Sequence, residues 1–278
     1  MTTLAHPLAN QKLQRSHPPR PRSALRAVAL PSEHGGWGLT GEPVLLGLLV
    51  APSVSGALLG IGALAAFLAR SPLKLALVDQ WCHRRLPRTV MAAVLAAAEL
   101  ACLGGLLSVV ALRSGRAWWL PLVAALPLVG VEMWFDMRSR GRRLVPELSG
   151  ALGIASIAVA VARAGGASWT MSLGLWTVLA ARSIGAIPFA RAQVMRWRHR
   201  PAPLSGPRAA QAVAVVIGGA GWAAGALPLA SWVALAAFAG WALWSLHRPP
   251  VQPKRLGYSQ MVFGVALVLV TAGSLRLA

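Results

Sequence analysis

The chain has 278 residues, of which 56% are hydrophobic and 12% are charged, and its mean hydropathy is +0.60. Soluble domains carry about 25% charged residues, so this composition excludes an ordinary water-soluble protein. Its hydrophobicity excludes a disordered chain. The formal net charge is +20, but the basic residues punctuate apolar stretches and form no single basic face, which argues against nucleic-acid binding. We therefore predict an integral membrane protein whose partner is the lipid bilayer.

The first 30 residues are polar and basic. They lack the apolar core of about 7–15 residues that a signal peptide requires. We interpret residues 1–30 as a disordered basic cytoplasmic tail. Residues 31–278 are predicted to form a single transmembrane helical domain, because no connection between apolar stretches is long enough for a soluble domain.

Nine apolar stretches have roughly the 20-residue length that crosses a bilayer as a helix. The first two, and the seventh and eighth, are separated only by short joints containing proline and glycine, which also occur inside transmembrane helices. The expected spans are 37–54, 55–75, 89–112, 117–135, 145–163, 167–190, 209–227, 228–246 and 258–277.

The distribution of basic residues tests this count, because lysine and arginine gather on the cytoplasmic side of membrane proteins. With the N-terminus inside, 22 basic residues fall on the cytoplasmic side and four on the other, and Arg182 lies within a span. Merging two adjacent spans would destroy this asymmetry. We therefore predict an all-α bundle of about nine spans in the cytoplasmic membrane, with the N-terminus inside and the C-terminus outside.

All seven acidic residues lie within a predicted span or a few residues from one. Ionisable groups at membrane depth are costly and usually face protein or a water-filled cavity. Most of these acids gather, with several basic residues, at the cytoplasmic ends of the spans. The candidate ligand-binding residues are Glu33, His34, Arg70, Lys74, Asp79, Glu132, Asp136, Glu147, Arg182 and Arg191.

Two pairs within this set share one spacing. Glu132 and Asp136 stand four residues apart, which places both carboxylates on one helical face, and Arg70 and Lys74 repeat the spacing. A cavity lined by both signs suits a metal–phosphate group or a zwitterionic ligand. The alternative is ordinary structural charge, with the arginines of 138–143 pairing with Glu132 and Asp136, His83 or Arg84 pairing with Asp79, and a helix dipole stabilising Glu147.

Glu99 and Arg182 lie far from any span end and are predicted to be intramembrane charges. A pair between them inside the bundle is one possibility. His34 beside Glu33 lacks the further spaced ligands of a metal site, and no glycine-rich phosphate loop is present. We therefore expect no metal site, and the sequence assigns no cofactor.

Five blocks resemble the YwiC-like family of bacterial integral membrane proteins. The resemblance runs from about residue 31 to the C-terminus, and implies a bacterial inner-membrane protein without naming a reaction. The family tends to carry an acid near Gln260, which this chain lacks. The blocks are Pro31–Trp37, Arg70–Lys74, Leu144–Gly150, Arg182–Arg196 and Lys254–Gln260.

We expect the polar cavity to bind an anionic or phosphorylated lipid or metabolite at the inner leaflet. One alternative is a small-molecule or ion transporter, in which Glu99 and Arg182 are gating or coupling charges. Another is a transferase acting on a prenyl substrate, because the architecture resembles UbiA-type prenyltransferases. Those enzymes hold a metal–diphosphate through two aspartate-rich motifs, and this chain lacks both. An enzyme further requires Glu132, Asp136 and Arg182 to converge on one pocket.

Overall fold

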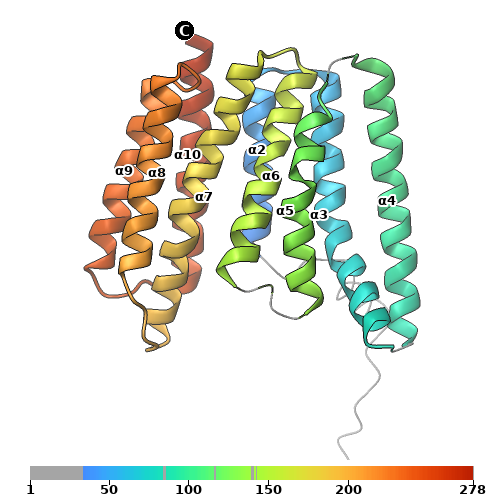
Figure 1. Ribbon diagram of the computed structural model, residues 1–278, viewed down its shortest axis with the longest axis horizontal. Coiled ribbons are helices and arrows are strands. Elements are labelled where there is room, and N and C mark those ends of the chain that lie inside the picture. Colours follow the sequence, from blue (N-terminus) through green and yellow to red (C-terminus); the bar gives the residue numbers. More distant parts are fainter. Residues whose placement is uncertain (1–33, 84–85, 116, 139–140, 142, 278) are drawn as a thin grey trace, which may run out of the picture.

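The computed structural model describes residues 34–83, 86–115, 117–138, 141 and 143–277, without the side chains of residues 34–36. Within this part the chain forms nine helices and no strand. Consecutive helices run in opposite directions along one bundle (Figure 1). The helices are α2 His34–Val50, α3 Val54–Trp81, α4 Pro87–Arg113, α5 Leu120–Met137, α6 Leu144–Ala164, α7 Trp169–Trp197, α8 Ser205–Ala223, α9 Leu229–Leu246 and α10 Pro253–Leu277.

The all-α fold is confirmed, and each predicted span corresponds to one helix. Both short joints are breaks in the helix. Ser53 begins α3 by accepting a hydrogen bond from the Gly56 amide, and Gly225, with φ of +68°, lies in the turn between α8 and α9. A left-handed backbone of this kind suits glycine, which has no Cβ.

Seven of the described helices are long and apolar enough to cross a membrane. Helices α2 and α8 fall outside this group, because the apolar part of α2 is short and α8 carries Arg208 and Gln211 in its first turns. Both helices nevertheless pack on their neighbours in the same bundle (Figure 1). The orientation of the bundle across the membrane stays a prediction.

Helices α3 and α7 continue to Trp81 and Trp197, several residues past the predicted ends of their spans. Hydropathy marks where a helix leaves hydrocarbon, and these extensions contain charged residues, Asp79 in α3 and Arg191 and Arg196 in α7. The helical hydrogen bonds continue beyond the apolar stretch, since residues such as Gln80 and Arg196 form helix readily.

The main core joins α2, α6, α7 and α10 around Leu46, Leu175, Val178 and Leu267. Helix α6 is buried along most of its length and consists largely of alanine, glycine and serine. Small residues let neighbouring backbones approach closely, which is how helices pack in a membrane. This central helix contacts α2, α3, α5 and α7.

Helix α4 lies at the periphery and packs only on α3 among the helices that the structure describes. Helix α5 packs on α6 and α3. Helices α4 and α5 do not pack on each other within the described chain, and side chains of both line a common cavity.

Candidate functional site

A cavity of about 480 Å³ lies between α3, α4, α5 and α6, with Thr40 of α2 also on its wall. This volume is within the range of about 300–1,000 Å³ typical of small-molecule pockets. Leucine and alanine dominate the wall. Its charged lining residues, within the described chain, are Arg70, Glu132 and Asp136.

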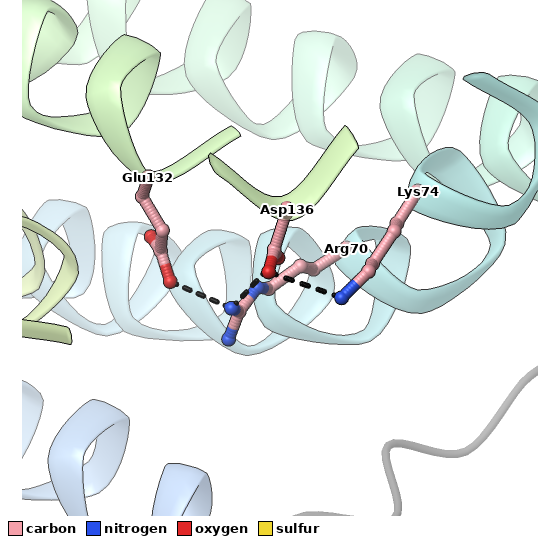
Figure 2. A network of polar contacts seen from close by, with 4 residues as sticks. All are labelled: Arg70, Lys74, Glu132 and Asp136. Atoms are coloured by element: carbon pink, nitrogen blue, oxygen red, sulfur yellow. Dashed lines mark hydrogen bonds and ion pairs between the residues drawn. The ribbon is translucent and has the colours of Figure 1, made fainter. Parts of the chain in front are cut away.

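The charged end of the cavity is a network of four side chains from α3 and α5 (Figure 2). Arg70 Nη2 lies 2.7 Å from Glu132 Oε1 and 3.0 Å from Asp136 Oδ2. Lys74 Nζ lies 3.0 Å from Asp136 Oδ1. Side chains four residues apart lie on the same face of a helix. The two cations of α3 can therefore meet the two carboxylates of α5 across the space between the helices. The four formal charges cancel.

Two glycines allow the carboxylates to reach these positions. A Cβ at Gly150 of α6 would come within 2.6 Å of the Glu132 carboxyl carbon, and one at Gly141 would overlap the Asp136 carboxylate. The Asp136 side chain is 3% exposed and that of Glu132 is 16% exposed. The carboxylates are therefore held between the cations of α3 and close backbone.

A second buried pair joins α2 to α7. Arg182 Nη1 lies 2.9 Å from Glu42 Oε2, with the two side chains 9% and 6% exposed. Arg182 Nη2 also donates a hydrogen bond of 2.6 Å to the carbonyl of Gln260 in α10. A Cβ at Gly264 would overlap the Glu42 carboxylate, so the close approach of α10 depends on that glycine.

Arg182 does not share the large cavity with Glu132 and Asp136. It lines a separate cavity of about 30 Å³ between α7, α8, α9 and α10, together with Gln211 and Gln260. The constellation expected from the sequence is therefore divided between two places. The three-residue convergence that an enzyme was expected to need is not formed in this structure.

Asp79 lies in the last turn of α3, close to the start of α4. Its described partners are Arg88, with Nη2 3.3 Å from Asp79 Oδ1, and Thr89, whose hydroxyl donates a hydrogen bond of 2.7 Å to Oδ2. These contacts fasten the start of α4 to α3. Of the partners expected from the sequence, Arg84 lies outside the described residues.

Glu147 and Arg191 form an ion pair of 2.9 Å between α6 and α7, with both side chains about one-third exposed. An exposed pair of this kind contributes little to stability, about 0–1 kcal/mol. Glu33 lies outside the described residues, and His34 begins α2 with its side chain undescribed. A role in ligand binding stays a prediction for all of these residues.

The possible pair between Glu99 and Arg182 is not formed, because the carboxylate that meets Arg182 among the described residues belongs to Glu42. Glu99 lies midway along α4, which packs on α3 alone within the described chain, whereas Arg182 is on α7. One carboxylate oxygen of Glu99, Oε2, is buried without a described hydrogen-bond partner.

Sequence reasoning did not include Glu42 among the site residues. The available signal was an acid two turns inside an apolar span, the same signal that singled out Glu99. Gly150 and Gly264 carried no distinguishing signal, because the chain has 28 glycines and only the neighbouring carboxylates set these two apart.

Comparison with known proteins gives one family. The family model described as YwiC-like protein matches residues 30–162, which confirms the resemblance over α2 to α6. This region contains all four residues of the network in Figure 2 and excludes Arg182. No curated protein and no solved structure shows significant similarity to the chain.

Proposed function

We propose that this chain, a multi-pass membrane protein with a YwiC-like region at residues 30–162, binds a phosphorylated lipid or lipid-like metabolite in its large cavity. The supporting observation is that an apolar cavity ends at the charged network of Arg70, Lys74, Glu132 and Asp136. The apolar wall suits an acyl or prenyl chain. Arg70 and Lys74 are the groups that would hold a phosphate through charge-assisted hydrogen bonds.

Access to the cavity supports a ligand that comes from the bilayer. Because α4 and α5 do not pack on each other, the cavity wall between them consists of side chains. Leu100 of α4 and Leu126 and Val129 of α5 line the cavity and are 44%, 61% and 42% exposed. A lipid chain would enter sideways here without leaving hydrocarbon.

We place the charged end of the cavity at the cytoplasmic side, in a bacterial inner membrane, on the positive-inside rule. Cys82, which is exposed and follows α3 at that end, reports the orientation. In a Cys102→Ala variant, a membrane-impermeant maleimide is expected to label Cys82 in inverted membrane vesicles and not in right-side-out vesicles. The reverse pattern would overturn this placement.

The Arg70 contact gives the direct test of the proposed ligand. Protein purified in mild detergent is expected to retain a phosphorylated lipid, and Arg70→Gln is expected to lower its occupancy about tenfold or more, the effect of losing a charged hydrogen bond. Native mass spectrometry and lipid extraction measure the occupancy. The matched control is Arg113→Gln, at the C-terminal end of α4. Equal retention of the lipid by the Arg70→Gln and Arg113→Gln variants would contradict the proposal.

A prenyl transferase is the alternative that the same cavity favours, because a prenyl chain would fit its apolar wall beside two carboxylates. However, Glu132 and Asp136 contact Arg70 and Lys74, and carboxylates that hold Mg²⁺ need their oxygens for the metal. Magnesium-dependent binding of a prenyl diphosphate, abolished by Asp136→Asn, would favour this alternative.

A transporter is the alternative that the Glu42–Arg182 pair favours, because buried intramembrane charges often couple to transport. The cavity beside Arg182, at about 30 Å³, has room for about one water molecule. A transported solute would therefore require a second conformation of α7 and α10.

A further inference from the structure

Two hydroxyl side chains line the otherwise apolar part of the large cavity. Thr40 of α2 and Ser156 of α6 are the uncharged polar side chains among its described lining residues. Both residues are buried, Thr40 at 1% and Ser156 at 5% exposed. Their hydroxyl groups therefore have either the protein or a ligand in the cavity as a hydrogen-bond partner.

The two hydroxyls differ in how they are satisfied. Ser156 Oγ donates a hydrogen bond of 2.6 Å to the carbonyl of Gly153. Thr40 Oγ1 is buried and has no hydrogen-bond partner among the described residues, and a buried hydroxyl without a partner is costly. A threonine in a helix uses two rotamers about χ1, so rotation can turn this hydroxyl between neighbouring positions. The O–H of Thr40 is thus available to an acceptor in the cavity.

Thr40 lies close to the charged end of the cavity. A Cβ at Gly47 of α2 would lie 3.0 Å from the carbonyl oxygen of Ala158 in α6, and the two helices run in the same direction (Figure 1). Thr40 is seven residues before Gly47, about 10 Å along the axis. The same step back along α6 ends beside Gly150, where a Cβ would meet the Glu132 carboxylate. About one helical turn or less therefore separates Thr40 from the charged network in depth.

From this placement we infer that the ligand is a phospholipid with ester-linked chains, and that Thr40 donates a hydrogen bond to an ester carbonyl. The inference rests on the proposed function, which puts the phosphate at the charged end. In a glycerophospholipid the ester carbonyls follow the phosphate by a few bonds, and the hydrocarbon begins beyond them. The cavity has the same order, with charged side chains first, then the Thr40 hydroxyl, then an apolar wall.

A prenyl phosphate fits this order less well. Its hydrocarbon begins at the carbon attached to the phosphate oxygen, so an apolar group would lie against Thr40 and leave the hydroxyl unpaired. An ester carbonyl has only acceptor oxygens, and a threonine hydroxyl has one hydrogen to donate. Thr40 is therefore a residue that selects how the chains are linked to the head group.

The test compares two lipids that differ only in the carbonyl. Full-length protein is reconstituted in nanodiscs with equal amounts of diacyl phosphatidylglycerol and its dialkyl ether analogue of the same chain length, extracted in mild detergent and measured by native mass spectrometry. Wild type is expected to retain the diacyl lipid over the dialkyl lipid by about fivefold, the effect of one neutral hydrogen bond. A wild-type ratio near one would overturn the inference without the use of any variant.

Thr40→Val removes the hydroxyl and keeps the shape of the side chain. It is expected to bring the ratio close to one, and to unfold no more easily than wild type when lipid is absent, because the hydroxyl has no described partner within the protein. Thr177→Val is the matched control, since the Thr177 hydroxyl donates to the Leu173 carbonyl within α7 and Thr177 does not line the cavity. It is expected to keep the wild-type ratio.

The outcomes separate this inference from the proposed function. Equal retention of the diacyl and dialkyl lipids by wild type would leave phospholipid binding standing and remove the ester contact. A fivefold preference that persists in Thr40→Val would overturn the assignment of that contact to Thr40. Absence of any bound lipid in wild type would remove both the proposed function and the inference.

Discussion

Replacement of Arg182 by methionine is expected to lower the free energy of unfolding by about 3–5 kcal/mol, the cost of removing one partner from a buried ion pair. The Glu42 carboxylate, 6% exposed, would remain between α2, α7 and α10 without its cation. The carbonyl of Gln260 would also lose the hydrogen bond that Arg182 donates. Unfolding in detergent, followed by tryptophan fluorescence, measures the loss.

The double variant Glu42→Gln, Arg182→Met separates the pair from general packing. It is expected to be more stable than the single Arg182→Met variant, because no charge is left buried. Arg276→Met, at an exposed position near the end of α10, is expected to unfold like wild type. A single variant as stable as wild type would show that the Glu42–Arg182 pair does not hold the bundle together.

A second substitution tests the Glu42–Arg182 pair by changing a glycine of α10 that lies against the Glu42 carboxylate. Gly264→Ala places a methyl group against the Glu42 carboxylate, whereas a Cβ at Gly273 of the same helix meets nothing within 4 Å. Gly264→Ala should therefore destabilise the protein in the same assay, and Gly273→Ala should not. Equal stability of the two would show that α10 adjusts without disturbing the pair.

The number and type of helices could be predicted from the sequence because each follows from a local property. Apolar length gave the spans, and the asymmetry of basic residues required that neither short joint be merged. The residues at those joints, Ser53 and Gly225, act locally as a helix cap and a left-handed turn. The ends of α3 and α7 were placed too early because their last turns are helical but polar.

The sequence could predict which charged residues share one face of a helix. It could not predict which residue of another helix each of them contacts. The shared spacing of Arg70 with Lys74, and of Glu132 with Asp136, was visible, but the contact between them joins residues 66 positions apart. Which helices are neighbours depends on packing of small side chains along the buried face of α6. The sequence contains two acids well inside spans, Glu42 and Glu99, and we considered only Glu99 as a partner of Arg182.

The sequence led us to expect a polar cavity near these charged residues, but the large apolar part of the cavity could not be predicted from it. Its apolar lining consists mainly of leucine and alanine, which are common throughout the chain, and it lies where α4 packs on α3 without reaching α5. No periodic pattern marks that separation. Only the charged end of the cavity could be recognised in the sequence, from the acidic residues within or near the predicted spans.

The most direct test of lipid binding in this cavity is to fill it. Ala63 of α3 lines the cavity, and Ala97 of α4 does not and is exposed. A tryptophan at position 63 would occupy space that the ligand's chain requires, whereas one at position 97 would face the bilayer.

The measurement is the amount of lipid bound per chain, by quantitative extraction and native mass spectrometry, in wild type, Ala63→Trp and Ala97→Trp. Wild type and Ala97→Trp are expected to retain about one lipid per chain, the capacity of a single pocket of this size, and Ala63→Trp is expected to lose most of it. Undiminished retention of the same lipid by a folded Ala63→Trp protein would contradict binding in the cavity between α3, α4, α5 and α6.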